Sequence, residues 1–233
     1  MTITTAAMTD IGRLRARNED SLLLDPDASL YAVADGMGGH AAGDAASQTA
    51  IAAFGATFTE TRSVLAAMKS ANRAVIERAA AEREKAGMGT TLTALHVRDS
   101  AMFVAHVGDS RLYRLRDGRL SQITRDHTVA QDMIETGKLT KEDAMQHPAS
   151  SMLTRSLGSR ADVEVDLIED QLAPGDLLML CSDGLTGMIT DGDLTMILAQ
   201  PKPLEHIAAE LVEAANRRGG LDNITALLVR IGG

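Results

Sequence analysis

Short apolar runs that end at an aspartate recur along this chain, and they constrain its fold more than any other feature. The clearest are residues 30–34 before Asp35, residues 102–107 before Asp109 and residues 177–181 before Asp183. Runs of this length and composition predict buried β-strands. Aspartate is disfavoured inside strands but suits their ends. We therefore expect each of these strands to end beside a carboxylate.

Helices and antiparallel strands are predicted in separate parts of the chain. Residues from Ala41 to about 58 are rich in alanine, a strong helix former. Apolar side chains recur at three- and four-residue steps over 63–85, which predicts a second helix. Between 91 and 123, strand-like runs with Asp117–Gly118 between the last two predict an antiparallel meander that includes a hairpin. A helix near 129–136, a strand at 177–181, a helix at 204–217 and a strand at 223–229 are also expected. Together these elements predict an α+β layered sandwich.

Length and charge limit the possible partners. The chain has 233 residues without a long linker or internal repeat, so one domain over 1–233 is expected. Its net charge of −9 argues against nucleic-acid backbones and anionic membranes as partners. No apolar stretch approaches the roughly 20 residues that span a bilayer, and residues 1–10 lack the features of a secretory signal. Cys181 is the only cysteine, which excludes an intrachain disulfide and a Cys-based zinc cluster. We expect a cytoplasmic protein.

Five aspartates share one setting, the edge of an apolar run: Asp20, Asp35, Asp109, Asp183 and Asp222. If these strand ends meet, the like charges raise one another's pKa values or push the strands apart. Mg²⁺ and Mn²⁺ take oxygen ligands and would remove that conflict. Two cations bridged by one carboxylate would lower the pKa of a shared water and orient it toward phosphorus. Gly36 has no Cβ, so its carbonyl would be able to approach a metal closely.

The residues alone leave other interpretations open. A single Asp-Gly pair most often marks a turn, and Asp117–Gly118 and Asp191–Gly192 are interpreted in this way. Residues 36–41 also match the glycine pattern of a dinucleotide-binding loop between a strand and a helix. Asp35 beside that loop would repel a pyrophosphate, and a meander follows instead of a second parallel unit. Both points favour the metal site.

Seven segments that contain these residues follow one another in a recognisable order. They are residues 12–20, 33–40 with Gly43, 89–91, 107–111, 126–128, 182–185 and 222–225. In this order they resemble the metal-dependent protein phosphatase family, also called the protein phosphatase 2C family, in its bacterial form. No single segment is decisive, but the joint order is highly specific and spans nearly the whole chain. The resemblance implies a four-layer α-β-β-α sandwich, in which helix pairs flank two antiparallel sheets and a cleft at one end holds metals.

The resemblance also implies a set of metal ligands: Asp20, Asp35, Gly36, Asp109, Asp183 and Asp222. Asp35 would bridge two Mn²⁺ or Mg²⁺ ions, the carbonyl of Gly36 would bind one of them, and Asp183 and Asp222 would hold the second. Asp20 would act through a metal-bound water. Asp109 would form, together with Asp183, the weaker third site of bacterial members.

Two further residues would act on the substrate. Arg15 would hold the phosphoryl oxygens, because guanidinium geometry suits that task, whereas Arg13 and Arg17 are expected to be solvated. His40 would be the general acid that protonates the departing Ser or Thr oxygen, since histidine titrates near neutral pH. Without the resemblance, His40 would be interpreted as a loop histidine bonded to backbone.

The function implied is that of a protein serine/threonine phosphatase that hydrolyses phosphoserine and phosphothreonine by a water activated between two metals. Its substrates would be phosphorylated proteins, with a Ser/Thr kinase and the targets of that kinase as the expected partners. Residues 126–160, dense in polar side chains, would form a flap subdomain beside the active site. The alternative is a regulatory module that binds a phosphoprotein or a kinase without turnover. A complete ligand pattern argues against that alternative.

Overall fold

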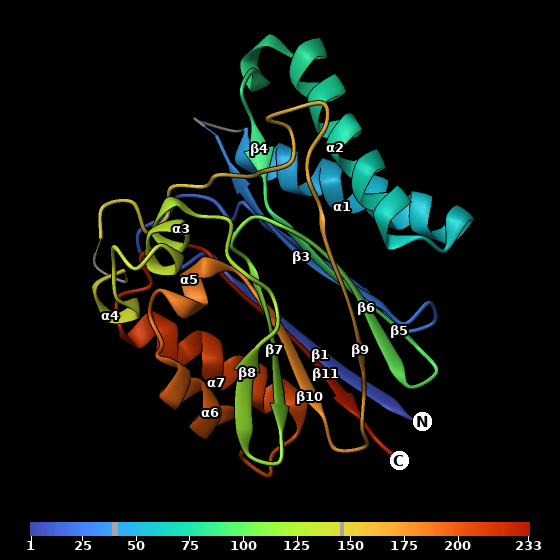
Figure 1. Cartoon of the computed structure of the whole chain (residues 1–233), viewed down its shortest axis with the longest axis vertical. Helices are drawn as coiled ribbons and strands as arrows, with labels where there is room; N and C mark the ends of the chain where they lie inside the picture. The colour runs from blue at the N-terminus through green and yellow to red at the C-terminus, as the bar shows by residue number, and fades with distance from the viewer. Residues whose placement is uncertain (39–41, 145–146) are drawn as a thin grey trace.

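Two antiparallel sheets stack face to face, with helices on both outer faces (Figure 1). The structure is a computed structural model that describes residues 1–38, 42–144 and 147–233. The first sheet has the order β1 (Ile3–Asp10), β11 (Ile224–Ile231), β10 (Leu177–Cys181), β7 (Arg111–Arg116) and β8 (Arg119–Gln122). The second has the order β2 (Asp20–Asp25), β3 (Leu30–Met37), β5 (Leu92–Arg98), β6 (Ala101–Val107) and β9 (Asp166–Gln171), with β4 (Gly89–Thr90) beside β3. The two chain ends lie side by side, because β1 pairs with β11.

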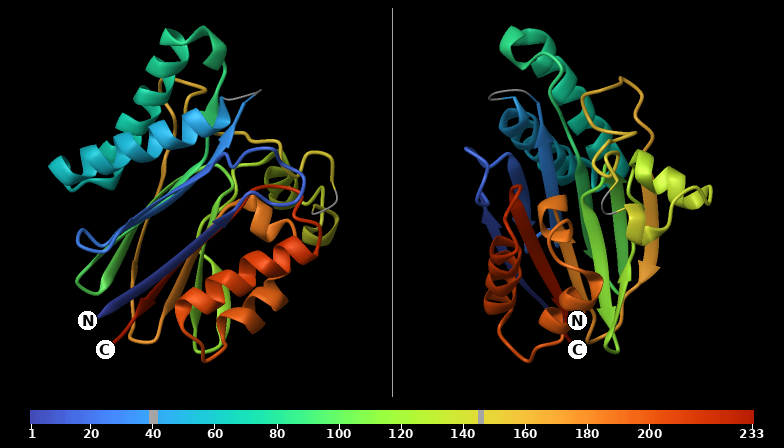
Figure 2. Two further views of the ribbon diagram at one scale, coloured as in Figure 1. Left: turned by 180° about the vertical axis from the view of Figure 1, so that it is seen from behind. Right: turned by 90° about the vertical axis from the view of Figure 1, so that its left-hand side faces the viewer.

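The helices form the two outer layers. Helices α1 (Gly43–Thr61) and α2 (Val64–Ala81) cover the second sheet, and α2 is followed by the short 3₁₀ helix η1 (Arg83–Lys85). Helices α5 (Asp183–Thr186), α6 (Asp191–Leu198) and α7 (Leu204–Arg217) cover the first sheet. Figure 2 shows the same layering from behind and from the side. The predicted four-layer α-β-β-α sandwich is therefore confirmed.

Three apolar layers hold these elements together, and the central strands contribute to two of them. Along β3, Leu30, Ala32 and Ala34 face α1 and α2, whereas Tyr31 and Val33 face the other sheet. The same alternation occurs in β10 and β11. Successive side chains of a strand point to opposite faces, so a strand that is covered on both sides must be apolar throughout. This explains the uninterrupted apolar runs of the sequence.

The predicted meander over 91–123 is wrong in its middle. Strands β5 and β6 pair in the second sheet, but β7 and β8 belong to the first. The chain crosses between the sheets at residues 108–110, where Gly108 has a φ of 110° that favours glycine. A Cβ on Gly108 would also lie 2.6 Å from the side chain of Thr91. Asp109 therefore lies in the connection that joins β6 of the second sheet to β7 of the first, and not in a hairpin between two paired strands.

Other elements differ in detail from the expectations. The hairpin at Asp117–Gly118 is confirmed, and both residues have positive φ, 51° and 74°. Asp191–Gly192 is not a turn, because Asp191 begins α6 after Thr190, whose side chain caps the helix. The second helix ends at Ala81 instead of residue 85. Strands β1 and β9 were not expected; both lie at sheet edges and bury fewer side chains.

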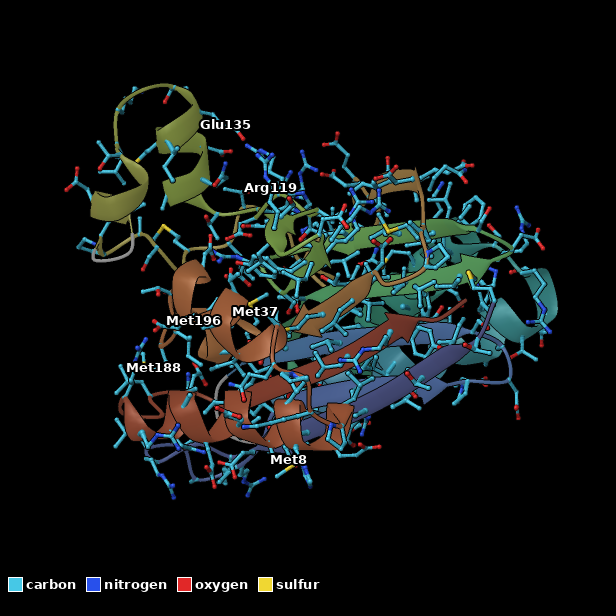
Figure 3. The ribbon with its side chains drawn as sticks, turned by 90° about the horizontal axis from the view of Figure 1, so that it is seen from below. Met8, Met37, Arg119, Glu135, Met188 and Met196 are labelled. Carbon is cyan, nitrogen blue, oxygen red and sulfur yellow. The ribbon has the colours of Figure 1, made fainter. Side chains whose placement is uncertain are left out.

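Residues 126–160 leave the sheets and contain α3 (Val129–Glu135) and α4 (Lys141–Ala144). Seen from below, this segment, with Glu135 on α3, stands at one end of the molecule (Figure 3). The backbone N–H of Thr154 donates to the carbonyl of His127, and that of Val129 donates to Met152, so the segment closes on itself. None of the helices in the described ranges combines the length and hydropathy needed to cross a bilayer.

Candidate metal centre

Carboxylates from both sheets gather at one end of the sandwich. Asp20 begins β2 and lies directly opposite Asp35 in the antiparallel β2–β3 pair. Asp109 follows β6, Asp183 follows β10, and Asp222 lies two residues before β11. The backbone N–H of Asp35 donates to Thr91 Oγ1 over 2.9 Å, which fixes the end of β3 beside the neighbouring strand.

The electrostatics show that these five groups are close enough to influence one another. Burial raises the pKa of Asp35 well above its ordinary value, and the charges of Asp183, Asp20 and Asp109 raise it further. Burial also raises the pKa of Asp183, and the neighbouring Asp222 adds to that shift. The structure thus brings together the aspartates predicted from strand ends.

Within the described ranges, two oxygen atoms of this cluster are buried without a hydrogen-bond partner: Asp20 Oδ1 and Asp183 Oδ1. Burial raises the pKa of Asp20 to about 7, even though Thr225 and Ser182 both donate to its other oxygen, over 2.6 and 2.7 Å. A buried polar atom without a partner is costly. Carboxylate oxygens that lack a hydrogen-bond partner and lie among other carboxylates are suitable ligands for a hard divalent cation.

The side chains are not arranged as a closed ligand shell. Among the described residues, no three acidic, histidine or cysteine side chains surround a common point as metal ligands do. Asp222 Oδ2 instead accepts from Arg15 Nη2 over 2.5 Å, and Asp20 faces the two hydroxyl groups. The ion pair between Arg15 and Asp222 brings the predicted phosphate-binding residue to the edge of the carboxylate cluster.

Gly36 lies where two backbone segments meet. A Cβ at this position would lie 2.0 Å from the carbonyl oxygen of Gly43 and 2.8 Å from that of Glu19, so only glycine fits. The backbone N–H of Gly36 donates to the Glu19 carbonyl over 3.1 Å. Close contact between backbones therefore requires glycine at position 36, in addition to the close approach of its carbonyl to a metal that the sequence predicts.

Glu19 is a neighbour of the site that the sequence analysis did not single out. Burial raises the pKa of its carboxyl, and the backbone N–H of Gly43 donates a hydrogen bond to it. A Cβ on Gly43 would lie 2.7 Å from Glu19 Oε1 and 2.8 Å from the Gly36 carbonyl, so these two oxygens crowd the same point. Glu19 lies next to Asp20 within the segment 12–20 that resembles the family, and this position is the sequence feature that could have indicated it.

His40, the predicted general acid, lies outside the described residues. Arg13 and Arg17 are exposed, as expected. Cys181 is buried among apolar side chains. His106 is also buried, and its two ring nitrogens form hydrogen bonds with Thr93 Oγ1 and with the carbonyl of Arg125.

The base of the flap is fixed to both sheets by polar contacts near Asp109. Asp126 accepts a bidentate pair from Arg111 of β7, with Nη2 at 2.6 Å. The next residue, His127, accepts at Nδ1 from the N–H of Gly108 over 3.1 Å and faces Asp166 of β9 through Nε2 over 3.1 Å. The segment at 126–128 therefore joins the flap to the crossing that carries Asp109.

Comparison with known proteins identifies the class. The family model described as Protein phosphatase 2C matches residues 14–228. A relative named serine/threonine phosphatase stp, from Listeria innocua, is 39% identical over 234 residues, covering 95% of this chain and 93% of the relative. The crystal structure of the serine/threonine phosphatase PstP/Ppp of Mycobacterium tuberculosis superposes with a TM-score of 0.94 at 38% identity, covering 100% of both chains.

A further crystal structure, of the PstP catalytic domain in complex with two manganese ions, matches with a TM-score of 0.90 at 38% identity over 99% of each chain. The chain belongs to the protein phosphatase 2C family. A dinucleotide-binding fold does not apply, because every pairing among the strands in the described ranges is antiparallel.

Proposed function

We propose that this protein removes phosphate from phosphoserine and phosphothreonine in proteins by direct attack of water, with two Mn²⁺ or Mg²⁺ ions held by the carboxylate cluster. Its enzyme class, protein serine/threonine phosphatase, is confirmed by the family and by the relatives. The observation that carries the mechanism is the convergence of five aspartates at the ends of strands from both sheets, two of which, Asp20 and Asp183, have a buried oxygen without a hydrogen-bond partner among the described residues. Such a donor set supports binding of hard cations at these strand ends.

The proposed ligands are those predicted from the resemblance. Asp35 and the carbonyl of Gly36 would bind one ion, and Asp35 would also bind the second, together with Asp183 and Asp222. When bound, such ions lower the pKa of a water and neutralise charge on the transferring phosphoryl group. Asp20 would act from β2 through a water, oriented by the hydroxyls of Ser182 and Thr225. Asp109 is buried, and both its burial and the charge of Asp183 raise its pKa, so we place it in a weaker third site together with Asp183.

Arg15 would bind the phosphoryl oxygens. Its guanidinium reaches Asp222 and is about half exposed, so it faces both the cluster and the solvent from which a substrate arrives. A planar guanidinium donates two parallel hydrogen bonds to a phosphate. His40 would protonate the departing Ser or Thr oxygen; this role derives from the resemblance alone.

The substrates are phosphorylated proteins, and we propose that they include a Ser/Thr kinase and its targets. We also propose that residues 1–233 act as one catalytic domain in the cytoplasm, with residues 126–160 as a flap beside the site. Support for the flap comes from its attachment through Asp126 and His127 to the strands next to Asp109.

The test is release of phosphate from a phosphothreonine peptide with Mn²⁺, with Mg²⁺ and with EDTA. We expect release only with a divalent cation. Activity that survives EDTA unchanged would exclude the mechanism. Calorimetry separates the enzyme from a binding module without turnover, which would show neither a Mn²⁺ site in the low-millimolar range or tighter nor phosphate release.

A further inference from the structure

The segment that carries Arg15, residues 11–19, contains no regular secondary structure in its course from β1 to β2. Arg15 is near the middle of this segment, and its side chain is 47% exposed. A long, exposed side chain on an irregular loop has many accessible conformations. Something else must therefore hold the loop in place if Arg15 is to meet a phosphate at a defined point.

Asn223 provides the contacts that hold this loop. It lies next to Asp222 and is only 3% exposed. Its side-chain Oδ1 accepts from the backbone N–H of Glu19 over 2.8 Å, and its Nδ2 donates to the carbonyls of Ile11, over 2.9 Å, and Arg17, over 2.8 Å. One amide thus bonds the loop on both sides of Arg15 and uses both of its donor hydrogens.

The backbone of Asn223 belongs to the other half of the same site. Its N–H donates to Asp222 Oδ1 over 2.8 Å, and Asp222 Oδ2 in turn faces Arg15 Nη2. The side chain of Asn223 therefore holds the loop of Arg15 while its backbone orients the carboxylate of Asp222. Aspartate at this position would lack both donors and would place a charge against two carbonyls.

We propose that Asn223 is a positioning residue, which sets the place of the Arg15 guanidinium relative to the carboxylate cluster and thereby the affinity for the phosphoryl group. This inference rests on the proposed function, because it takes Arg15 as the phosphate-binding residue. Positioning errors of about 1 Å cost up to roughly 100-fold in rate. Loss of the Asn223 side chain acts through Arg15 and leaves the backbone contact to Asp222 in place.

The chain offers a matched control in Asn72 of α2. This residue is 2% exposed and makes the same set of bonds: Nδ2 donates to the carbonyls of Arg160, over 2.8 Å, and Ala161, over 3.2 Å, and Oδ1 accepts from the N–H of Gly158 over 2.9 Å. Asn72→Ala and Asn223→Ala therefore remove equivalent hydrogen bonds, and only the second removes them from the loop of Arg15.

The experiment is a double-mutant cycle on hydrolysis of para-nitrophenyl phosphate at saturating Mn²⁺. Arg15→Ala should raise KM, and Asn223→Ala should raise it about tenfold with a smaller change in kcat. In the Arg15→Ala background, Asn223→Ala should change KM less than twofold, because the residue through which it acts is already absent. Asn72→Ala should leave KM within about twofold of wild type. It should lower the thermal stability by about as much as Asn223→Ala does.

A readout without turnover accompanies the kinetics. In the metal-free protein, amide hydrogen exchange at residues 11–19 should speed up in Asn223→Ala and not in Asn72→Ala. If Asn223→Ala does not fold, Asn223→Asp, which keeps the shape and the bond from Glu19, takes its place in both measurements.

The outcomes separate this inference from the proposed function. Absence of Mn²⁺-dependent hydrolysis by the wild type would overturn the proposed function, and an unchanged KM in Arg15→Ala would overturn the role of Arg15 in phosphate binding. With those two results as expected, equal KM effects of the two asparagine variants, or full additivity with Arg15→Ala, would show that Asn223 acts only on stability and would overturn the positioning role.

Discussion

Asp20 and Asp35 occupy directly opposite positions of the antiparallel β2–β3 pair, so two half-buried aspartates lie on the same face of the sheet. Like charges in such a pair destabilise a sheet. Both pKa values are raised, which shows that the folded chain without cations resists full ionisation. The cluster is therefore costly for stability, and its retention makes physical sense only if it serves function.

The first prediction concerns this cost. Asp35→Asn should raise the free energy of unfolding of the metal-free protein at pH 8 by about 1 kcal/mol, because it removes a carboxyl group whose ionised form the folded state disfavours through burial and neighbouring carboxylates. The same variant should lose most of the rise in Tm that Mn²⁺ produces in the wild type. Urea unfolding in EDTA and thermal unfolding with added Mn²⁺ measure the two effects. Asp27→Asn, the same change in an exposed turn, is the control; a metal-free Asp35→Asn protein less stable than this control would contradict the prediction.

The second prediction concerns catalysis. Asp183→Asn should lower Mn²⁺-dependent phosphate release by at least about 100-fold, since it removes a charged oxygen donor from the centre of the cluster. Asp191→Asn is a close match, because Asp191 also precedes a glycine and also begins a helix, yet it lies outside the cluster. Steady-state phosphate release measures both variants. Comparable losses in the two would remove Asp183 from the site.

The third prediction tests the general acid. His40→Ala should slow hydrolysis of phenyl phosphate, which has a poor leaving group, about tenfold more than hydrolysis of para-nitrophenyl phosphate. The reason is that an activated leaving group departs without a proton. His206→Ala, at an exposed position of α7, should affect neither ester. Equal slowing of the two esters by His40→Ala would exclude the acid role.

The fourth prediction concerns stability at low pH. Burial and the neighbouring His127 lower the pKa of His106 to about 4 from an ordinary value of 6.5. The folded protein therefore holds His106 neutral while the unfolded chain takes up a proton, so this contribution is lost as the pH falls from about 6.5 toward 4. The loss should reach roughly 3 kcal/mol.

Urea unfolding between pH 4 and pH 7 measures this loss. His106→Gln should flatten the pH dependence of the unfolding free energy, whatever its stability at pH 7. His206→Gln, which removes an exposed histidine, should keep the slope of the wild type. An unchanged slope in His106→Gln would show that this histidine is protonated in the folded protein as readily as in the unfolded chain.

Strands buried on both faces were predictable, whereas the edge strands β1 and β9 were not. The apolar runs of β3, β10 and β11 contribute to two core layers each, so nearly every residue in them must be apolar. Strands β1 and β9 lie at the sheet edges, where many side chains face solvent and apolar residues are mixed with polar ones, so neither strand forms an apolar run. The change of sheet after β6 was also missed, because a glycine and two polar residues fit a tight turn equally well by local sequence.

The sequence by itself determined which residues are candidates for the chemistry: aspartates at strand ends, an arginine five residues before one of them, and a family order of segments. Local pattern decides this, because aspartate and glycine stop a strand wherever it lies. Only the tertiary structure decided that burial and the charge of Asp183 raise the pKa of Asp35, that Ser182 and Thr225 donate to Asp20, and that Asn223 bonds the loop of Arg15. Burial and hydrogen bonding between residues some 150 or more positions apart set those pKa values and contacts, and no local sequence pattern encodes such distances.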